Sequence, residues 1–317
     1  MAVRTGLAKS TSEPRSSARM SLAARKEAIA ALLFLLPNIV GFVIFTVGPV
    51  LGSAGISLLQ WNIVTPPVWQ GLSNYIRLIT DMEFWNSLRA TLYYTVATVP
   101  LGIVLSFALA LALNTNNKGV SLYRTIYFIP VVTSMVAVSL MWRWIYNPTS
   151  GILNYMLDRL FTALGLNIRP PDWLQSATWA MPAIALMSVW KGLGYNMVIY
   201  LAALQGIPRH LYEAAEIDGA SDWHRLIHIT IPLVSPTTFF VLIMAIIGSF
   251  QVFDQAYVMT QGGPARATVT TVYYIYENGF RWYKMGYASS IAWVLFALVM
   301  VASLIQWRYQ ERWVFYE

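Results

Sequence analysis

The run ATLYYTVATVPLGIVLSFALALALNTNN, residues 90–117, contains 28 consecutive positions without a charged side chain. Its apolar part, about Thr91–Leu113, would be long enough as a helix to cross a hydrocarbon layer about 30 Å thick, because a helix rises about 1.5 Å per residue. The run therefore predicts a helix that spans a membrane.

The composition of the whole chain points to the same environment. Of its 317 residues, 57% are hydrophobic and 11% are charged, whereas soluble domains carry about a quarter charged residues. The mean hydropathy is +0.54. A soluble core could not bury this much apolar surface, so lipid is the expected solvent. Cysteine is absent, which excludes a disulfide framework and a thiolate metal site.

Five other charge-poor runs resemble the first. We predict membrane helices over about 28–51, 91–113, 125–146, 177–204, 233–253 and 285–307. Arg143 interrupts the third run near its end, and Lys191 lies inside the fourth. The expected fold is an all-α membrane protein with about six transmembrane helices, so both termini would lie on the same side.

The positions of the lysines and arginines predict the orientation. Residues 1–27 form a basic tail, and the apolar stretch after it is longer than the apolar region of a signal peptide, about 7–15 residues. With this tail inside, the cytoplasmic segments carry twelve Lys and Arg and the outer segments carry eight. We therefore expect a basic cytoplasmic tail over 1–27, a transmembrane domain over 28–317, and cytoplasmic termini.

Two longer outer segments, residues 52–89 and 147–176, combine helical spacing with mixed polarity and turn residues. Such segments are typical of helices that lie at a membrane surface or in the periplasm.

A polar segment, EAAEIDGASDWHRLIHITIPL at 213–233, stands between two apolar runs. Pro208 is expected at the first position of a short helix, and Gly219 can adopt a positive φ at low cost. Ser221 is a favourable N-cap for a second, amphipathic helix, and Pro232 marks the entry into the fifth span. The pattern fits either a solvated helical hairpin that joins two spans or a docking element for a cytoplasmic partner.

The motifs Glu-Ala-Ala at 213–215, Asp-Gly-Ala at 218–220 and Ile-x-Ile-Pro at 229–232 resemble the EAA loop of binding-protein-dependent ABC importer permeases. The resemblance continues through FLLPNIVGFVIFTVGPVLGSAGISLLQWN at 34–62 and TQGGPARATVTTVYYIYENGF at 260–280. It covers all but about the first 25 residues, and it is greatest to MalF/UgpA-type subunits of the carbohydrate-uptake branch.

The resemblance implies a permease subunit of an importer in the bacterial plasma (inner) membrane. The solute would be a sugar or a sugar-like molecule, such as an oligosaccharide, a polyol or glycerol phosphate, moved by alternating access. The implied partners are a second, MalG-type permease, an ATPase dimer that binds ATP and Mg, an extracytoplasmic solute-binding protein and the lipid bilayer, with no nucleic acid. This chain would be no enzyme and need no cofactor of its own, since it lacks a G-x-x-x-x-G-K-[ST] phosphate loop.

The resemblance also assigns ATPase docking to the EAA loop, about 207–232. The implied docking residues are Glu213, Ala214, Ala215, Asp218 and Gly219, with Glu213 as the ion-pair partner of a basic residue on the ATPase.

His224 and His228 lie four residues apart in the same loop and could bind a metal on one helix face. No third ligand is evident, so a position on a helix face in contact with water explains them better, and no metal site is predicted.

Polar residues inside membrane spans are costly, which makes them candidates for a substrate path. The predicted set is Trp190, Lys191, Tyr195, Asn196, Phe250, Gln251 and Asp254. In this set the amides of Asn196 and Gln251 would bind hydroxyls, and Trp190, Tyr195 and Phe250 would form walls. Helix packing or an interfacial position explains the aromatic residues equally well. Lys191 would either extend towards the interface or pair with Asp254.

Two other classes of membrane protein fit the sequence less well. A secondary transporter would need an ion-coupling site within its spans and usually carries an inverted repeat, and the sequence shows neither. A membrane anchor or assembly protein would not need the aromatic and polar residues of the fourth and fifth runs.

Overall fold

The computed structural model describes residues 22–115 and 117–315, and it divides into two units, Met1–Ser53 and Ala54–Glu317. Most of the predicted basic tail, residues 1–27, lies outside the described residues. The first unit contains α1 (Leu22–Phe42), η1 (Val43–Val47) and the beginning of α2 (Gly48–Ser57). These elements join into one candidate span, Arg25–Ser57, whose apolar side chains are largely exposed, as a lipid-facing helix requires.

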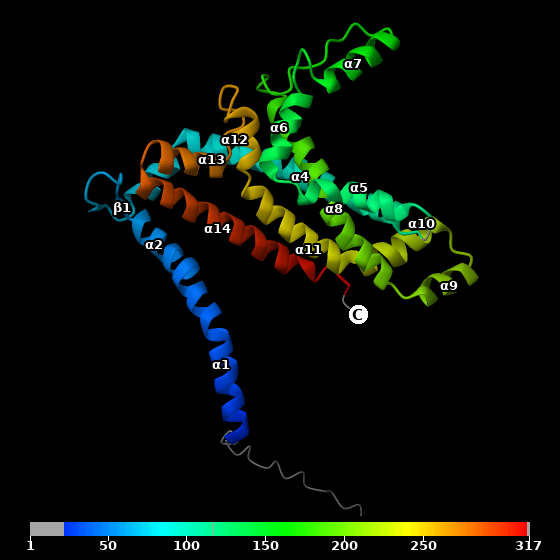
Figure 1. The fold of residues 1–317 in the computed structure, drawn as a ribbon, viewed down its shortest axis with the longest axis horizontal. Coiled ribbons are helices and arrows are strands. Elements are labelled where there is room, and N and C mark those ends of the chain that lie inside the picture. The colour runs from blue at the N-terminus through cyan, green and yellow to red at the C-terminus, as the bar shows by residue number, and fades with distance from the viewer. Residues whose placement is uncertain (1–21, 116, 316–317) are drawn as a thin grey trace, which may run out of the picture. The chain divides into compact units, whose positions relative to one another are not determined.

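The second unit is built almost entirely of helices (Figure 1). They are α3 (Ser73–Thr80), α4 (Met82–Leu113), α5 (Val120–Val132), α6 (Met135–Ile145), α7 (Ile152–Ala163), α8 (Ala180–Gly206), α9 (Arg209–Ile217), α10 (Asp222–Arg225), η2 (Leu226–Thr230), α11 (Ile231–Phe250), α12 (Asp254–Thr260), α13 (Thr271–Tyr276), η3 (Glu277–Arg281) and α14 (Met285–Gln310). A short antiparallel pair, β1 (Leu59–Gln60) and β2 (Val68–Trp69), was not predicted. The all-α prediction is confirmed.

Four unbroken helices of this unit are long and apolar enough to cross a membrane: Met82–Leu113, Ala180–Gly206, Asp222–Phe250 and Met285–Gln310. They correspond to the second, fourth, fifth and sixth predicted spans. The outer segments also contain the expected short helices, α3 in one and α7 in the other.

The third predicted span, over 125–146, is not one unbroken helix. The chain instead forms α5 and α6, which are bent by 103° at Thr133 and Ser134. Pro130 lies near the end of α5, and proline removes a backbone donor and disturbs the helix around it. The Thr133 hydroxyl donates to the Ile129 carbonyl at 3.1 Å, which satisfies one acceptor at this break.

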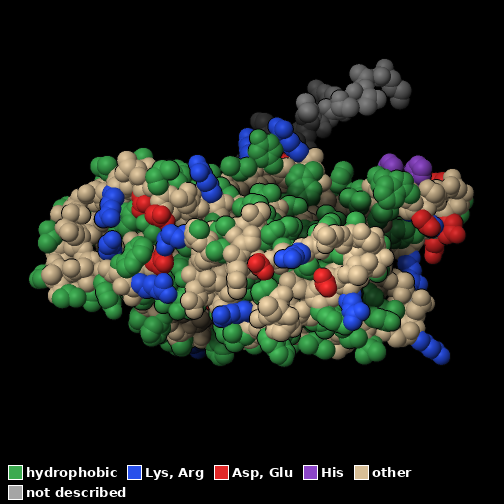
Figure 2. Space-filling model, turned by 90° about the horizontal axis from the view of Figure 1, so that it is seen from above, with side chains coloured by type: hydrophobic (Ala, Val, Ile, Leu, Met, Phe, Trp, Pro, Cys, Tyr) green, Lys and Arg blue, Asp and Glu red, His purple; other side chains and the backbone are tan. Residues whose placement is uncertain are grey.

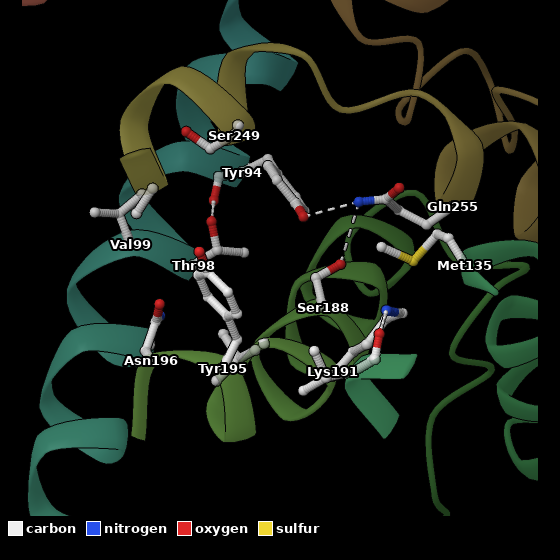
Figure 3. Close-up of a pocket in the computed structure, with 16 residues that line it drawn as sticks. Tyr94, Thr98, Val99, Met135, Ser188, Lys191, Tyr195, Asn196, Ser249 and Gln255 are labelled. Carbon is white, nitrogen blue, oxygen red and sulfur yellow. Dashed lines mark hydrogen bonds between the residues drawn. The ribbon is translucent and has the colours of Figure 1, made fainter. Parts of the chain in front are cut away.

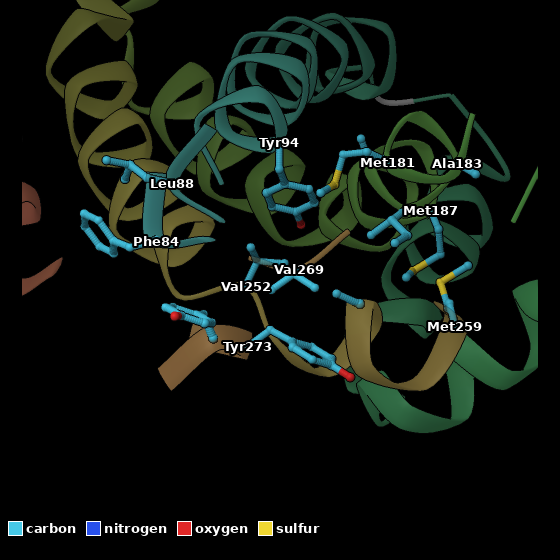
Figure 4. Close-up of a cluster of buried hydrophobic side chains, with 14 of the residues drawn as sticks. Phe84, Leu88, Tyr94, Met181, Ala183, Met187, Val252, Met259, Val269 and Tyr273 are labelled. Atoms are coloured by element: carbon cyan, nitrogen blue, oxygen red, sulfur yellow. The ribbon is translucent and has the colours of Figure 1, made fainter. Parts of the chain in front are cut away.

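Helix α8 is the centre of the bundle, because it packs against α4, α5 and α11. Its closest approach to α5 is at Gly194, where a Cβ atom would lie 2.0 Å from the Tyr127 carbonyl oxygen. Towards one end of the bundle, side chains from α4, α8, α12 and α13 meet in a buried cluster that includes Phe84, Met187 and Tyr273 (Figure 4).

Asp81 joins three helices at the same end of the bundle. Its carboxylate caps α4 through the backbone amides of Glu83 and Phe84, and it accepts hydrogen bonds from the hydroxyls of Tyr274 on α13 and Tyr287 on α14. Burial alone would raise the pKa of Asp81, but these hydrogen bonds outweigh it and hold the pKa below its usual value.

We expect Gly194→Ala to lower the melting temperature of the purified protein in detergent. The added methyl group would push α5 away from α8, and overpacking of this kind costs about 1–3 kcal/mol. Gly192→Ala, on the same helix, is the matched control. Apart from the neighbouring backbone of α8, no atom lies within 4 Å of the position that its Cβ would take. Equal melting temperatures for the two variants would show that α8 and α5 do not meet this closely.

Candidate functional site

The polar hairpin, residues 209–230, joins α8 to α11 and consists of α9, a turn, α10 and η2. Pro208 directly precedes α9 instead of occupying its first position. Gly219 has a φ of +75°, and the Ala220 amide donates to the Ala215 carbonyl at 2.9 Å, which ends α9 in the usual way for a glycine C-cap. Ser221 then caps α10 by accepting from the His224 amide, as predicted.

Side chains brace the two arms of the polar hairpin against each other. Arg225 on α10 forms ion pairs with Asp222 and, at 3.7 Å, with Glu216 on α9. The hydroxyls of Tyr212 on α9 and Thr230 on η2 are hydrogen-bonded at 2.9 Å. The turn is therefore held at both its tip and its base.

The residues predicted to dock lie on the open surface of the polar hairpin. Glu213, Ala214, Asp218 and Gly219 are exposed, and Ala215 is half-buried. Two large apolar side chains beside them are also exposed, Ile217 at 87% and Trp223 at 66%. In Figure 2, histidine side chains and a group of acidic side chains lie close together at one end of the view. An exposed mixture of apolar and acidic groups is a surface on which a basic protein partner could bind.

The rings of His224 and His228 stack at 5.8 Å on this surface. The Nδ1 atom of His224 is bonded to the Ser221 hydroxyl at 2.7 Å, and that of His228 to the His224 carbonyl at 3.1 Å. Among the described residues, no group of three or more His, Cys, Asp or Glu side chains could hold a metal ion.

A cavity of about 320 Å³ lies between α4, α8 and α11, beside the break between α5 and α6 (Figure 3). Three of the predicted substrate-path residues line it: Lys191, Tyr195 and Asn196. The other polar lining residues are Tyr94, Thr98, Ser188, Ser249 and Gln255. Hydroxyl, amide and aromatic groups in one recess suit a ligand that has both hydroxyl groups and an apolar face.

Gln255 and Tyr94 are lining residues that the sequence analysis missed. The Gln255 side-chain amide donates to the Tyr94 hydroxyl at 2.9 Å and to the Ser188 hydroxyl at 3.4 Å, so it joins α12 to α4 and α8. A signal for this wall of the cavity existed in the sequence. Thr91, Tyr94 and Thr98 follow a helical spacing along the second span, which places polar groups on one face.

Four other predicted path residues do not line the cavity. Trp190 packs against Trp142 on α6, with ring centroids 5.4 Å apart, and Phe250 is buried at the end of α11. Gln251 and Asp254 are exposed beyond that end. Helix α11 stops at Phe250, so Gln251 leaves the helical face that borders the cavity. Asp254 begins α12, whose next residue, Gln255, is the one that lines the cavity.

The suggested pair between Lys191 and Asp254 is not formed in the described structure. The Lys191 ammonium instead donates to the Val131 carbonyl in the last turn of α5, at 3.4 Å. It therefore stands at the negative end of a helix that stops inside the bundle.

Residues 99–315 match the family described as the binding-protein-dependent transport system inner membrane component. The chain belongs to this family. It is 36% identical over 303 residues to the probable ABC transporter permease protein YesP of Bacillus subtilis (strain 168), covering 94% of this chain and 96% of YesP. It is 37% identical over 278 residues to the lactose transport system permease protein LacF of Rhizobium radiobacter, covering 86% and 91%.

The fold of this permease is also known from a crystal structure of a bacterial ABC transporter involved in the import of the acidic polysaccharide alginate. The two chains superpose with a TM-score of 0.78 at 24% sequence identity, covering 90% of this chain and 96% of the other. This likeness shows that the arrangement of helices is shared.

One continuous helix connects the two candidate sites of the permease. It runs from Asp222 in the polar hairpin to Phe250 over 29 residues, which corresponds to roughly 43 Å. Ala245, Gly248 and Ser249, near its far end, line the cavity. A displacement of the polar hairpin along this axis would therefore move one wall of the cavity.

Proposed function

We propose that this chain is the membrane-spanning permease subunit of an ABC importer for a sugar or a sugar-like solute, such as an oligosaccharide, a polyol or glycerol phosphate. The observation that carries the proposal is the single helix that joins an exposed, acidic hairpin to a polar cavity within the bundle. The lactose permease LacF, which matches most of the chain, supports the sugar assignment.

Energy for transport would come from a partner ATPase dimer that binds ATP and Mg, while this chain has no enzymatic role. The polar hairpin would sit on the ATPase, with Glu213, Ala214, Ala215, Asp218 and Gly219 at the contact. Glu213 is exposed and would pair with a basic residue of that partner. The ion pairs and the hydrogen bond within the hairpin would make it stiff enough to transmit movement.

The transport cycle would be alternating access. Closure of the ATPase dimer on ATP would move the polar hairpin and, through the continuous helix, the α11 wall of the cavity. The cavity would then open outwards to receive solute from an extracytoplasmic binding protein, and ATP hydrolysis would return it. A second, MalG-type permease would complete the path, because one subunit encloses the cavity only in part.

The membrane orientation belongs to the same proposal. The polar hairpin and both termini would be cytoplasmic, and α3 and α7 would lie on the outer side of the bacterial plasma membrane. The excess of lysine and arginine in the segments assigned to the inside supports this orientation.

We expect Glu213→Arg to reduce ATP-coupled uptake about tenfold or more, because like charges at a docked contact cost several kcal/mol. Uptake of radiolabelled solute and ATP hydrolysis by the assembled importer would be measured, with the amount of inserted permease as a reference. Asp158→Arg is the control, since it makes the same charge change on the exposed surface of α7. Full coupling in the Glu213→Arg importer would exclude this docking role.

The absence of cysteine permits a direct test of orientation. In intact cells, a membrane-impermeant maleimide should label Thr162→Cys, on α7, but should label His210→Cys, on α9, only after permeabilisation. Both positions are exposed, so differences in burial would not explain a difference in labelling. The reverse pattern would invert the proposed topology.

A further inference from the structure

The charge inside the cavity indicates which kind of solute it suits. Lys191 is the one basic residue among the described residues that line it, and no aspartate or glutamate is among them. A charged group within a membrane span is costly unless a partner compensates it. The question is which group serves as that partner.

The protein itself compensates Lys191 only in part. Its ammonium has three donors, and its one hydrogen bond to the described residues is the 3.4 Å contact with the Val131 carbonyl. The end of α5 contributes the equivalent of about half a negative charge. The dipole of α5 therefore compensates the ammonium only in part, and two of the three donors of Lys191 have no partner among the described residues.

The neighbouring polar groups complete a site around this charge. Tyr94 and Ser188 are already bonded to Gln255, whereas the amide of Asn196 has no hydrogen-bond partner in the described structure. Tyr195 is half exposed and borders the same space. Asn196 lies five residues after Lys191 on α8, which is about 7.5 Å along the helix axis and about 140° around it, so the two side chains lie on different sides of the cavity (Figure 3). A ligand that contacts both would therefore extend across the cavity.

A second cation lies further towards the α7 end of the same two helices. A recess of about 500 Å³ is bordered there by Arg89 of α4 and by Arg266. Arg266 is neutralised by Glu83 at 2.6 Å and Glu277 at 2.8 Å. Arg89 forms no ion pair with the described residues. Both spaces along α4 and α8 thus contain a cation that no carboxylate of the described chain neutralises.

We propose that the solute carries an anionic group, a carboxylate or a phosphate, on a hydroxyl-bearing body, and that Lys191 binds this group in the cavity. This inference rests on the proposed function. The anion would compensate the part of the Lys191 charge that the dipole of α5 does not compensate. Asn196 would bind a hydroxyl, and Tyr195 would cover an apolar face of the solute.

The test uses two matched pairs of probes with the full-length permease in its assembled importer, reconstituted in lipid nanodiscs. Trigalacturonate is compared with its trimethyl ester, and glycerol 3-phosphate with glycerol. Saturation-transfer NMR would give the dissociation constants at pH 7. We expect the charged member of at least one pair to bind about tenfold more tightly than its neutral counterpart, because hydrogen bonds to charged groups are the stronger ones. The pair that shows the difference identifies a carboxylate or a phosphate.

Variants assign the preference to Lys191. Lys191→Gln should remove the preference for the charged probe and leave the dissociation constants of the neutral probes unchanged. Lys191→Arg should keep the preference. Ser188→Asp places a carboxylate about one turn before Lys191 on α8. This variant should remove the preference for the charged probe although Lys191 itself is unchanged. Lys284→Gln is the control, since Lys284 lies over Trp282, 5.2 Å from the ring centroid, and does not line the cavity.

The outcomes separate the two proposals. Equal binding of charged and neutral probes would overturn the anionic solute and leave the cavity as a solute site. A preference that survives Lys191→Gln and Ser188→Asp would overturn the assignment to Lys191. If none of the four probes bound to the unaltered importer, both the anionic solute and the cavity as a solute site would be rejected, whereas loss of coupling in Glu213→Arg would still support the role in transport.

Discussion

Hydrocarbon offers no hydrogen-bond partners, and this constraint underlies every part of the structure. Within the spans the backbone is helical, and hydroxyl side chains donate to their own helix, as Thr98 does to the Tyr94 carbonyl and Ser106 to the Gly102 carbonyl. The bend between α5 and α6 is the place where a predicted span leaves this pattern. There, Thr133 and Lys191 donate to the Ile129 and Val131 carbonyls. The Lys191 side chain satisfies a backbone carbonyl at this bend and, by doing so, places a charged group inside the bundle.

The same arrangement relates the cavity to the polar hairpin. Gly194 allows α8 to lie close to α5, while the polar faces of α4 and α8 stay far enough apart to enclose a space with α11. Because α10, η2 and α11 form one continuous helix, the wall of that space and the second arm of the hairpin belong to the same helix. The π-helical turn η2 lies between them, and such turns are often found at functional sites. A mechanical link between the two sites follows from this continuity.

Several local features could be predicted because they depend on a few neighbouring residues. The positive φ of Gly219 and the cap at Ser221 follow from backbone sterics and from the unpaired amides at a helix start. The cavity positions of Lys191, Tyr195 and Asn196 agree with the cost of placing polar groups in a span. Trp190 and Phe250 pack within the bundle, which is the alternative that the sequence left open, because an aromatic ring packs equally well against a helix or a ligand. Gln255 was missed because its partners, Tyr94 and Ser188, are 161 and 67 residues away in the chain.

The sequence by itself determined that this chain is a helical membrane protein with one acidic hairpin between two spans, because the length of an apolar run and the chemistry of a turn are local properties. Only the tertiary structure decided that the third run bends by 103°, that Lys191 faces α5 instead of Asp254, and that the cavity contains a cation without a carboxylate partner. These features depend on which helix faces lie opposite each other. The residue pattern along a single run does not predict which other helices pack against it.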